Sequence, residues 1–350
     1  MNPHPVQPIV YSAKSLLLSL ATLLAVLMGY NGLIAHTAKK SQRQQKLDAA
    51  SALSPQTDCL LAGNSLVECG IDPNTFDNAW ASNRTTTANI ALGATLPPEQ
   101  YILLKHALQK PHRLRYFIYG FLDDQLTLPS EGKWSTLIGN RALAYYDPVT
   151  AAHYYSPGSM LKIWQLEITR DIPILSERSS PWHRVELLRR HVAEIGLPKR
   201  PVNIFGRYDD FASLEPKSVE TFAQYCNAVV SQKQPFTQPV SDMFALAQAH
   251  GAQVILVEMP VPTRHRTRFY STEVWHQTRA YFQTLARQKR ITYIDADSWI
   301  PDQGNFIDAM HLSRSGAILF SQRLGTVLYR TGMTANDGQK EANAAIRGAN

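Results

Sequence analysis

Residues 59–73 have the sequence CLLAGNSLVECGIDP, in which a short apolar run ends at Gly63, Asn64 and Ser65. An apolar run of this length predicts a strand buried in the core. The glycine, asparagine and serine that follow predict a tight turn at the end of that strand. In open α/β folds the functional groups lie at the carboxyl edge of the sheet. The turn is therefore either an ordinary loop or the place where a nucleophilic serine is presented.

Four further apolar segments predict strands that extend the first one into a sheet. They have the sequences TANIALG, LRYFIYGF, AQVILVEMP and ITYIDAD and begin at residues 87, 114, 252 and 291. Strands that are apolar along their whole length are typical of parallel sheets covered on both faces. Helical patterns begin at residues 97, 241, 271 and 313, between or after these strands. The alternation predicts a doubly wound α/β domain, a three-layer sandwich around a mostly parallel sheet.

One long interval, residues 125–239, lacks a strand of comparable clarity. It contains clustered tyrosines and an amphipathic helical pattern over residues 180–196. We interpret it as an insertion that forms a lid or a substrate-binding lobe. The alternative is that its tyrosines only pack the insertion.

Composition indicates a globular protein. Hydrophobic residues make up 44% of the 350 residues and charged residues 18%. The net charge is +7, and the basic residues lie in scattered clusters without a zinc-finger spacing or an RNA-recognition signature. Nucleic acid is therefore not an expected partner, whereas an acidic polysaccharide or an anionic membrane surface fits the charge better.

The amino-terminal segment 15–35 has no charged residue. About 20 apolar residues, each rising ~1.5 Å, span a hydrocarbon core of ~30 Å. We predict a single transmembrane helix that also serves as the export signal, with a cleavable signal peptide as the alternative. The predicted order is then a tail (1–14), the span, a polar stalk (36–55), the folded domain (56–331) and a disordered tail (332–350).

The charges around this segment favour the opposite orientation to export. Lys14 is the only basic residue before it, whereas Lys39, Lys40, Arg43 and Lys46 follow it. Because basic residues accumulate on the cytoplasmic side, this pattern favours a cytoplasmic domain.

The three cysteines do not form a metal-binding pattern or a disulfide framework. Cys59 and Cys69 flank the turn at Ser65, and they either pair in an oxidising compartment or stay as buried free thiols. Cys226 is left single within a helical pattern.

A second polar pair, Asp308 and His311, lies just before the last predicted helix. A carboxylate three residues from a histidine can hold one ring nitrogen and leave the other free as a base. A serine needs such a base to act as a nucleophile at neutral pH. Ser65 follows the first strand and His311 follows the last, so the sheet edge can bring them together.

With these blocks in this order, the chain resembles the SGNH (GDSL-type) hydrolases. Gly63-Asn64-Ser65 is similar to the family's first block, Gly93 to its second, and Asp308 to His311 to its last. The resemblance covers residues 56–330 apart from the insertion. It implies a Ser65-His311-Asp308 triad and an oxyanion hole built from the backbone N–H groups of Ser65 and Gly93, with a contribution from the Gly120 region.

The third block departs from the family pattern. Residues 120–123, Gly-Phe-Leu-Asp, place Leu122 where the family has an asparagine that donates to the oxyanion. Loss of one such donor costs about 2.7–4 kcal/mol of transition-state stabilisation.

The resemblance extends to membrane-anchored relatives that modify polysaccharides or teichoic acids. It implies an exported esterase or O-acyltransferase on the periplasmic or cell-surface side, acting on acyl groups of an envelope polysaccharide, with a membrane-bound partner that supplies the acyl donor. Two alternatives stay open. One is a degenerate glycan-binding or scaffold component, which Leu122 favours. The other is an intracellular lipid or thioester hydrolase, which the basic residues after the span favour.

Four further residues are candidates for substrate binding: Asn64, Asp123, Arg264 and Arg266. The alternatives are a helix cap for Asp123 and a solvated basic loop for the two arginines. The sequence has no phosphate-binding loop and no metal-ligand spacing, so it predicts neither a cofactor nor a metal.

Overall fold

The computed structural model describes residues 12–37, 42–80, 86–110, 114–127 without Asp124, 143–176 and 218–331, together with the single residues 189, 192 and 195. The predicted helix over 180–196, apart from these three residues, and the predicted tail over 332–350 therefore lie outside the described residues, as does most of the amino-terminal tail.

Five parallel strands form one sheet, as the sequence predicts, with the order β2-β1-β3-β4-β5. The strands are β1 (Cys59–Ala62), β2 (Thr87–Asn89), β3 (Tyr116–Phe121), β4 (Gln253–Glu258) and β5 (Thr292–Asp295). Every residue of β1 and β3 is buried, which explains why these segments are apolar at consecutive positions. In the register of the sheet, Ile118 pairs with Leu61 on one side and with Ile255 on the other.

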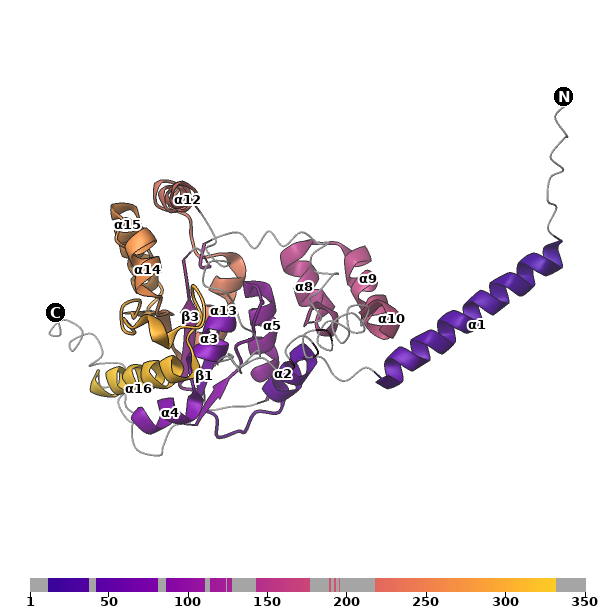
Figure 1. Ribbon diagram of the computed structural model, residues 1–350, viewed down its shortest axis with the longest axis horizontal. Helices are drawn as coiled ribbons and strands as arrows, with labels where there is room; N and C mark the ends of the chain where they lie inside the picture. Colours follow the sequence, from indigo (N-terminus) through magenta and orange to yellow (C-terminus); the bar gives the residue numbers. More distant parts are fainter. Residues whose placement is uncertain are drawn as a thin grey trace, which may run out of the picture.

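Helices cover both faces of this sheet and complete the doubly wound fold. Those that follow the strands are α3 (Ser65–Gly70), α4 (Pro73–Ala79), α5 (Pro97–Ala107), α13 (Gln238–Ala249), α15 (Glu273–Gln288) and α16 (Arg314–Arg330). Helix α16 packs against α3 and α4, while α5 packs against α13. Figure 1 shows the strands between α16 and α4 on one side and α5 and α13 on the other.

The connections between these elements include several short turns of helix. Between β4 and α15 lie α14 (Thr263–His265) and a π-helical turn, η1 (Arg266–Tyr270). A 3₁₀ turn, η2 (Gln303–Asn305), follows β5. These connections lie after the carboxyl ends of β4 and β5, where the fold places functional groups.

Two glycines allow α3 to lie close to the sheet. Gly63 has φ +147°, and a Cβ added there would lie 2.6 Å from Cγ2 of Val67. A Cβ at Gly120, on β3, would lie 2.4 Å from the same methyl group. Because real Cβ atoms do not approach that closely, both positions require glycine while Val67 faces them.

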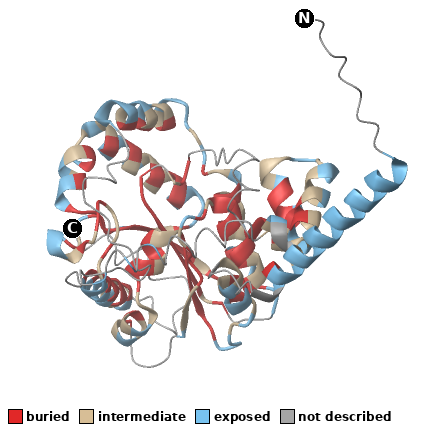
Figure 2. Cartoon of the chain, turned by 45° about the vertical axis from the view of Figure 1, so that its right-hand side comes forward, coloured by how far each residue is buried: buried red, intermediate tan, exposed pale blue. Residues whose placement is uncertain are grey.

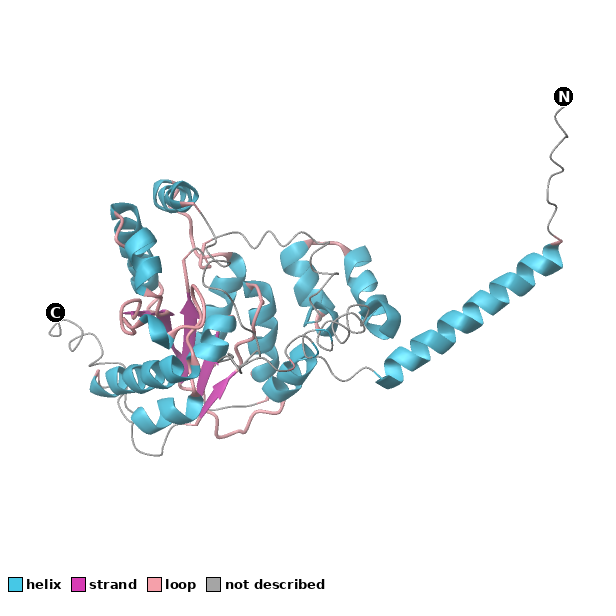
Figure 3. Cartoon of the chain, viewed as in Figure 1, coloured by secondary structure: helices cyan, strands magenta, loops and turns pink. Residues whose placement is uncertain are grey.

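The regular secondary structure in the described part of the insertion is helical, with turns and loops between the helices (Figure 3). Its helices are α7 (Leu143–Tyr146), α8 (Pro148–Tyr155), α9 (Met160–Asp171), α10 (Pro173–Ser176) and α12 (Val219–Ser231). Tyr154 packs edge-on against Tyr101 of α5 and donates a hydrogen bond to Asp242 of α13 at 2.7 Å. This tyrosine therefore fastens the insertion to the helix layer, which is the packing role considered as the alternative.

The amino-terminal helix α1 (Ala13–Thr37) projects from the domain, with its carboxyl end beside α10 (Figure 1). Residues 13–35 are long and apolar enough to cross a membrane, and Figure 2 shows α1 exposed along almost its whole length. The polar stalk was predicted too long. Residues 42–51 form α2 (Gln42–Ser51), which packs against α5 through the buried side chains of Leu47 and Ala50. Two apolar residues at helical spacing are enough to dock a segment whose other residues are polar.

All three cysteines are free and buried. Burial raises the pKa of Cys69 to about 12 and also raises that of Cys59 well above its ordinary value. The pairing of Cys59 with Cys69 that the sequence allowed is not present, and the free-thiol alternative is the one observed.

The close approach at Gly120 can be tested by substitution. We expect Gly120→Ala to lower the free energy of unfolding of the full chain in detergent by about 1–3 kcal/mol, because the new methyl group overlaps Val67. In the Val67→Ala background the added cost of Gly120→Ala should be smaller, since the nearest clash is gone. Gly304→Ala, whose Cβ would meet only ordinary contacts, is the control. Equal costs of Gly120→Ala in both backgrounds would contradict this account.

Candidate active site at the carboxyl edge of the sheet

Ser65 is placed by the turn that follows β1. Asn64 precedes α3 as its N-cap, and its side-chain oxygen accepts a hydrogen bond from the backbone N–H of Leu66 at 3.0 Å. Ser65 is the first residue of α3, where helix geometry leaves the backbone N–H without an acceptor inside the helix. Asn64, predicted as a substrate-binding residue, therefore has a local role in setting this turn.

His311 and Asp308 lie in the loop between η2 and α16. An isolated antiparallel bridge pairs Phe306 with Leu312, and the backbone N–H of Ile307 donates to the carbonyl of His311 at 3.0 Å. Ser313 then caps α16 by accepting from the N–H of Gly316. The loop is thus fixed on both sides of His311.

The structure brings the serine, the histidine and the aspartate into one chain of hydrogen bonds. Nε2 of His311 lies 2.8 Å from Oγ of Ser65, and Nδ1 lies 2.7 Å from Oδ2 of Asp308. With Asp308 ionised, Nδ1 carries the proton that it donates to this carboxylate. Nε2 is then free to accept the serine proton.

Asp308 is fully buried, and its hydrogen bonds keep it ionised. Burial acts to raise the pKa of this carboxyl, but the hydrogen bonds and charge of His311 outweigh it. The other carboxylate oxygen accepts from the backbone N–H groups of Met310, at 2.8 Å, and of His311, at 2.7 Å. Together these interactions hold the pKa of Asp308 below its ordinary value.

The second predicted oxyanion donor, the backbone N–H of Gly93, is occupied. It donates to Oε2 of Glu68 at 2.6 Å. Glu68 lies one helical turn after Ser65 on α3, so both side chains face the same way. The charge of Glu68 also acts on Lys46 of α2, whose pKa burial lowers and this carboxylate partly restores. Glu68 is not among the residues predicted from the sequence. Its spacing of three residues from Ser65 is a local signal, but its contact with Gly93 depends on the fold.

The third block offers no side-chain donor. Leu122 is buried, and its backbone N–H donates to Oε1 of Gln125 at 3.1 Å. Gly120 lies within β3, under Val67. This position gives Gly120 a packing role. Its contribution to the oxyanion hole stays a prediction.

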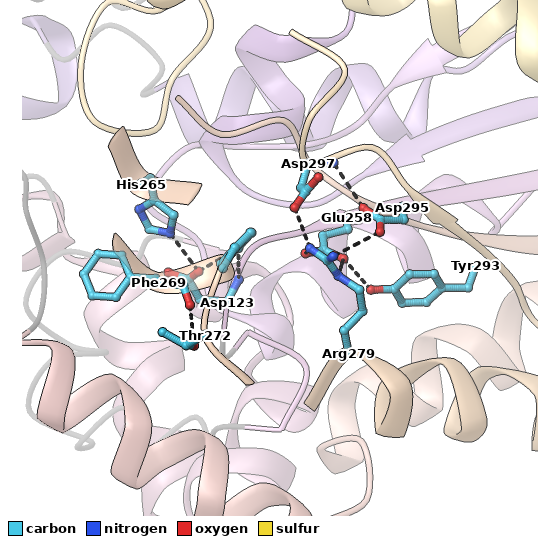
Figure 4. A network of polar contacts seen from close by, with 10 residues as sticks. Asp123, Glu258, His265, Phe269, Thr272, Arg279, Tyr293, Asp295 and Asp297 are labelled. Atoms are coloured by element: carbon cyan, nitrogen blue, oxygen red, sulfur yellow. Dashed lines mark hydrogen bonds and ion pairs between the residues drawn. The ribbon is translucent and has the colours of Figure 1, made fainter. Parts of the chain in front are cut away.

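Asp123 is held in a buried polar cluster. The hydroxyl of Tyr270 donates to its carboxylate at 2.7 Å, and Nε2 of His265 lies 3.2 Å from the same oxygen (Figure 4). Asp123 has φ +48°, a backbone conformation that asparagine and aspartate tolerate better than most residues. The cluster fixes the turn after β3 against η1, so the described contacts of Asp123 are structural.

Arg264 and Arg266 lie on α14 and η1, directly after β4. The side chain of Arg264 is exposed. Nη2 of Arg266 donates to Oγ1 of Thr263 at 2.9 Å, whereas its buried Nε has no hydrogen-bond partner. Substrate binding by either arginine stays a prediction.

Three carboxylates that the sequence analysis missed converge at the ends of β4 and β5. Glu258, Asp295 and Asp297 bring one oxygen each within 4.8 Å of the others. Arg279 of α15 fills the centre, with distances of 2.7 Å to Glu258, 3.1 Å to Asp295 and 2.6 Å to Asp297 (Figure 4). Burial raises the pKa of Glu258 to about 7, even though Arg279 acts to lower it. The positive charge that such a cluster needs is supplied by the protein itself.

Comparisons with known proteins give matches to solved structures at low identity and low TM-score. No protein-family model and no curated protein sequence matches this chain. Similar solved structures include the YxiM protein of Bacillus subtilis, with 14% identity and a TM-score of 0.38. The match covers 80% of this chain and 58% of the YxiM chain. A "putative acylhydrolase" of Bacteroides fragilis has 12% identity and a TM-score of 0.37, and the match covers 83% of this chain and 100% of that one. A "putative arylesterase" of Agrobacterium tumefaciens has 11% identity and a TM-score of 0.32, and the match covers 78% of this chain and 98% of that one. At these values the similarity carries no argument about activity.

The carboxylate cluster predicts a pH-dependent effect of Arg279. We expect Arg279→Met to lower the free energy of unfolding by about 3–5 kcal/mol, because it leaves buried carboxylates unpaired. The pKa of Glu258 in the folded protein, about 7, is above its ordinary value of 4.5, so the stability gained from its protonation is lost as the pH rises through this range. Removal of Arg279 raises this pKa further.

The difference in unfolding free energy between wild type and Arg279→Met should therefore widen from pH 5 to pH 8 in urea titrations. Arg323→Met removes an arginine whose Nη1 donates to the carbonyl of Trp299, and it is the matched control with little pH dependence. A difference for Arg279→Met that is constant with pH would count against the ionic account.

Proposed function

We propose that this chain is a membrane-anchored serine esterase or O-acyltransferase of the SGNH type. Its substrate is an ester on a cell-envelope polysaccharide, with acetyl as the acyl group. The observation that carries the proposal is the hydrogen-bond chain from Ser65 through His311 to the buried carboxylate of Asp308. This is the arrangement that converts a serine hydroxyl into a nucleophile.

The first half of the reaction acylates Ser65. As Oγ bonds to the ester carbonyl carbon, its proton passes to Nε2 of His311. Asp308 stays ionised and stabilises the imidazolium, in keeping with its lowered pKa. His311 then gives the proton to the departing alcohol oxygen, and the acyl group stays on Ser65. General-base assistance of this kind contributes about 10²–10⁴-fold.

The second half releases the acyl group. A water molecule or a sugar hydroxyl gives its proton to Nε2 of His311 and attacks the acyl carbon. When the tetrahedral intermediate collapses, the proton returns to Oγ of Ser65. Water gives hydrolysis and a sugar hydroxyl gives acyl transfer, so the same three residues serve both outcomes.

The oxyanion is stabilised by backbone N–H groups in this proposal. The N–H of Ser65 at the start of α3 is one donor, and the N–H of Gly93 is the other once Glu68 has moved away. An ionised Glu68 on the Gly93 N–H competes with the oxyanion for the same donor. Substrate binding therefore has to displace this carboxylate.

The layout of the chain supports the proposed membrane location and envelope substrate. Helix α1 is long and apolar enough to span a bilayer, and the resemblance to membrane-anchored polysaccharide-modifying enzymes favours an extracytoplasmic domain. The same resemblance suggests a membrane-bound partner that supplies the acyl donor. The basic residues after α1 favour the opposite orientation and an intracellular ester substrate. A topology reporter fused after residue 331 distinguishes the two orientations.

A second candidate function is glycan binding without catalysis. Leu122 in place of a side-chain donor and the occupied N–H of Gly93 both favour it. In that case the serine, histidine and aspartate have no catalytic role and no activated nucleophile exists.

Labelling with a fluorophosphonate separates these two candidates. We expect the full chain in detergent to be labelled at Ser65, and Ser65→Ala to abolish labelling. His311→Ala should slow it by at least about 100-fold, because the base is lost. Ser271→Ala and His276→Ala, which change exposed residues outside the triad, are matched controls. An unlabelled but folded wild type would favour the glycan-binding function.

Glu68 variants test the occupied oxyanion donor. We expect labelling rates to rise in the order wild type, Glu68→Gln, Glu68→Ala, because the Gly93 N–H loses first a charged acceptor and then any acceptor. A gain of about tenfold in the labelling rate corresponds to a fall of about 1.4 kcal/mol in the activation free energy. Glu167→Ala, on α9, is the control. Loss of labelling in folded Glu68→Ala would instead make this carboxylate a positive contributor to the site.

A further inference from the structure

Helix α9 of the insertion is apolar on two opposite faces. On one face Leu166 is fully buried and Thr169 nearly so. On the other, Met160, Leu161 and Trp164 are 74%, 66% and 60% exposed. At about 100° per residue these three fall within one arc on the side of the helix away from Leu166. We call Met160, Leu161 and Trp164 the α9 face.

The α9 face belongs to the part of the domain that lies next to α1. Helix α10 packs against both α9 and α1. Ile34, near the carboxyl end of α1, is buried, whereas the leucines earlier in that helix are exposed. Figure 1 shows α9 and α10 beside the end of α1 from which the chain enters the domain. The α9 face thus lies on the same part of the domain as the carboxyl end of the segment that is apolar enough to cross a membrane.

We propose that the α9 face inserts into the interfacial layer of the bilayer that α1 spans. Large exposed apolar side chains grouped on one helix need a non-aqueous partner, and a tryptophan among them is typical of the membrane interface. The position beside α1 selects the bilayer over a protein partner, because α1 brings the lipid surface to this end of the domain. The proposal rests on the membrane span by α1 and is independent of the catalytic chemistry.

Attachment to the bilayer through both α1 and the α9 face would restrict the orientation of the domain. A single transmembrane helix attaches the domain to the bilayer at one place only. A second contact through the α9 face fixes the orientation of the sheet relative to the membrane plane. The edge that carries Ser65 then has a defined direction of approach for its substrate.

The test places an environment-sensitive nitrobenzoxadiazole label on one introduced cysteine at a time, with the three native cysteines kept. Because Cys59, Cys69 and Cys226 are buried, the wild type serves as the unlabelled blank. Leu161→Cys probes the α9 face, Leu24→Cys in α1 is the positive control, and Leu319→Cys on α16 is the matched exposed leucine away from α1. The full chain is reconstituted into phosphatidylcholine vesicles with and without a spin-labelled lipid that quenches the probe.

We expect spin-labelled lipid to reduce the fluorescence at residues 24 and 161 about twofold or more and to leave residue 319 unchanged. Ser65→Ala should give the same pattern, so a failed catalytic proposal does not alter this result. An unquenched label at residue 161 beside a quenched one at residue 24 would overturn the proposal. If that unquenched label were also blue-shifted, the face would belong to a second copy or another protein. No quenching at residue 24 would overturn the span and this proposal together.

Discussion

The site depends on the packing of Val67 against the backbone of β3 and of the turn after β1. The Val67 methyl group lies where Gly63 and Gly120 leave room, so α3 approaches the sheet more closely than a side chain at either glycine would permit. That approach fixes the first turn of α3, and with it the direction of Ser65. The side-chain amide of Asn89 on β2 adds a polar tie, because it donates to the carbonyls of Val67 and Ile71. The serine is thus positioned by a buried contact on one side and by hydrogen bonds on the other.

Buried charge is handled differently in the two polar clusters at this edge. Asp308 has a histidine and two backbone N–H groups around it, so its negative charge is stabilised where it is needed. Glu258 lies beside the carboxylates of Asp295 and Asp297. Its pKa is raised because Arg279 only partly offsets the effect of burial. The first arrangement leaves one imidazole nitrogen available for chemistry. The second consumes the donors of its arginine in holding β4, β5 and α15 together.

The sequence was informative where a feature depends on residues close together in the chain. The five strands were predicted from continuous apolar runs, and the Asp308 and His311 pair from a spacing of three residues. The role of Glu68 and the Arg279 cluster were not predicted, because each depends on side chains brought together by the fold from separate elements. The length of the stalk was overestimated for a related reason. Leu47 and Ala50 are too few to signal a buried helix, and the surface of α5 that receives them is visible only in the folded protein.

The hydrogen bond between Ser65 and His311 joins residues 246 positions apart. A ribosome makes the serine long before it makes the histidine. Strand β1 lies between β2 and β3, so it cannot be paired on both sides until β3 has been synthesised. During translation the hydroxyl of Ser65 therefore lacks its base for most of the life of the nascent chain. A truncated product that ends before His311 would leave the Ser65 hydroxyl without this hydrogen-bond partner. The hydrogen-bond chain from Ser65 through His311 to Asp308 is in this sense a property of the finished chain, because it joins the turn after the first strand to the loop before the last helix.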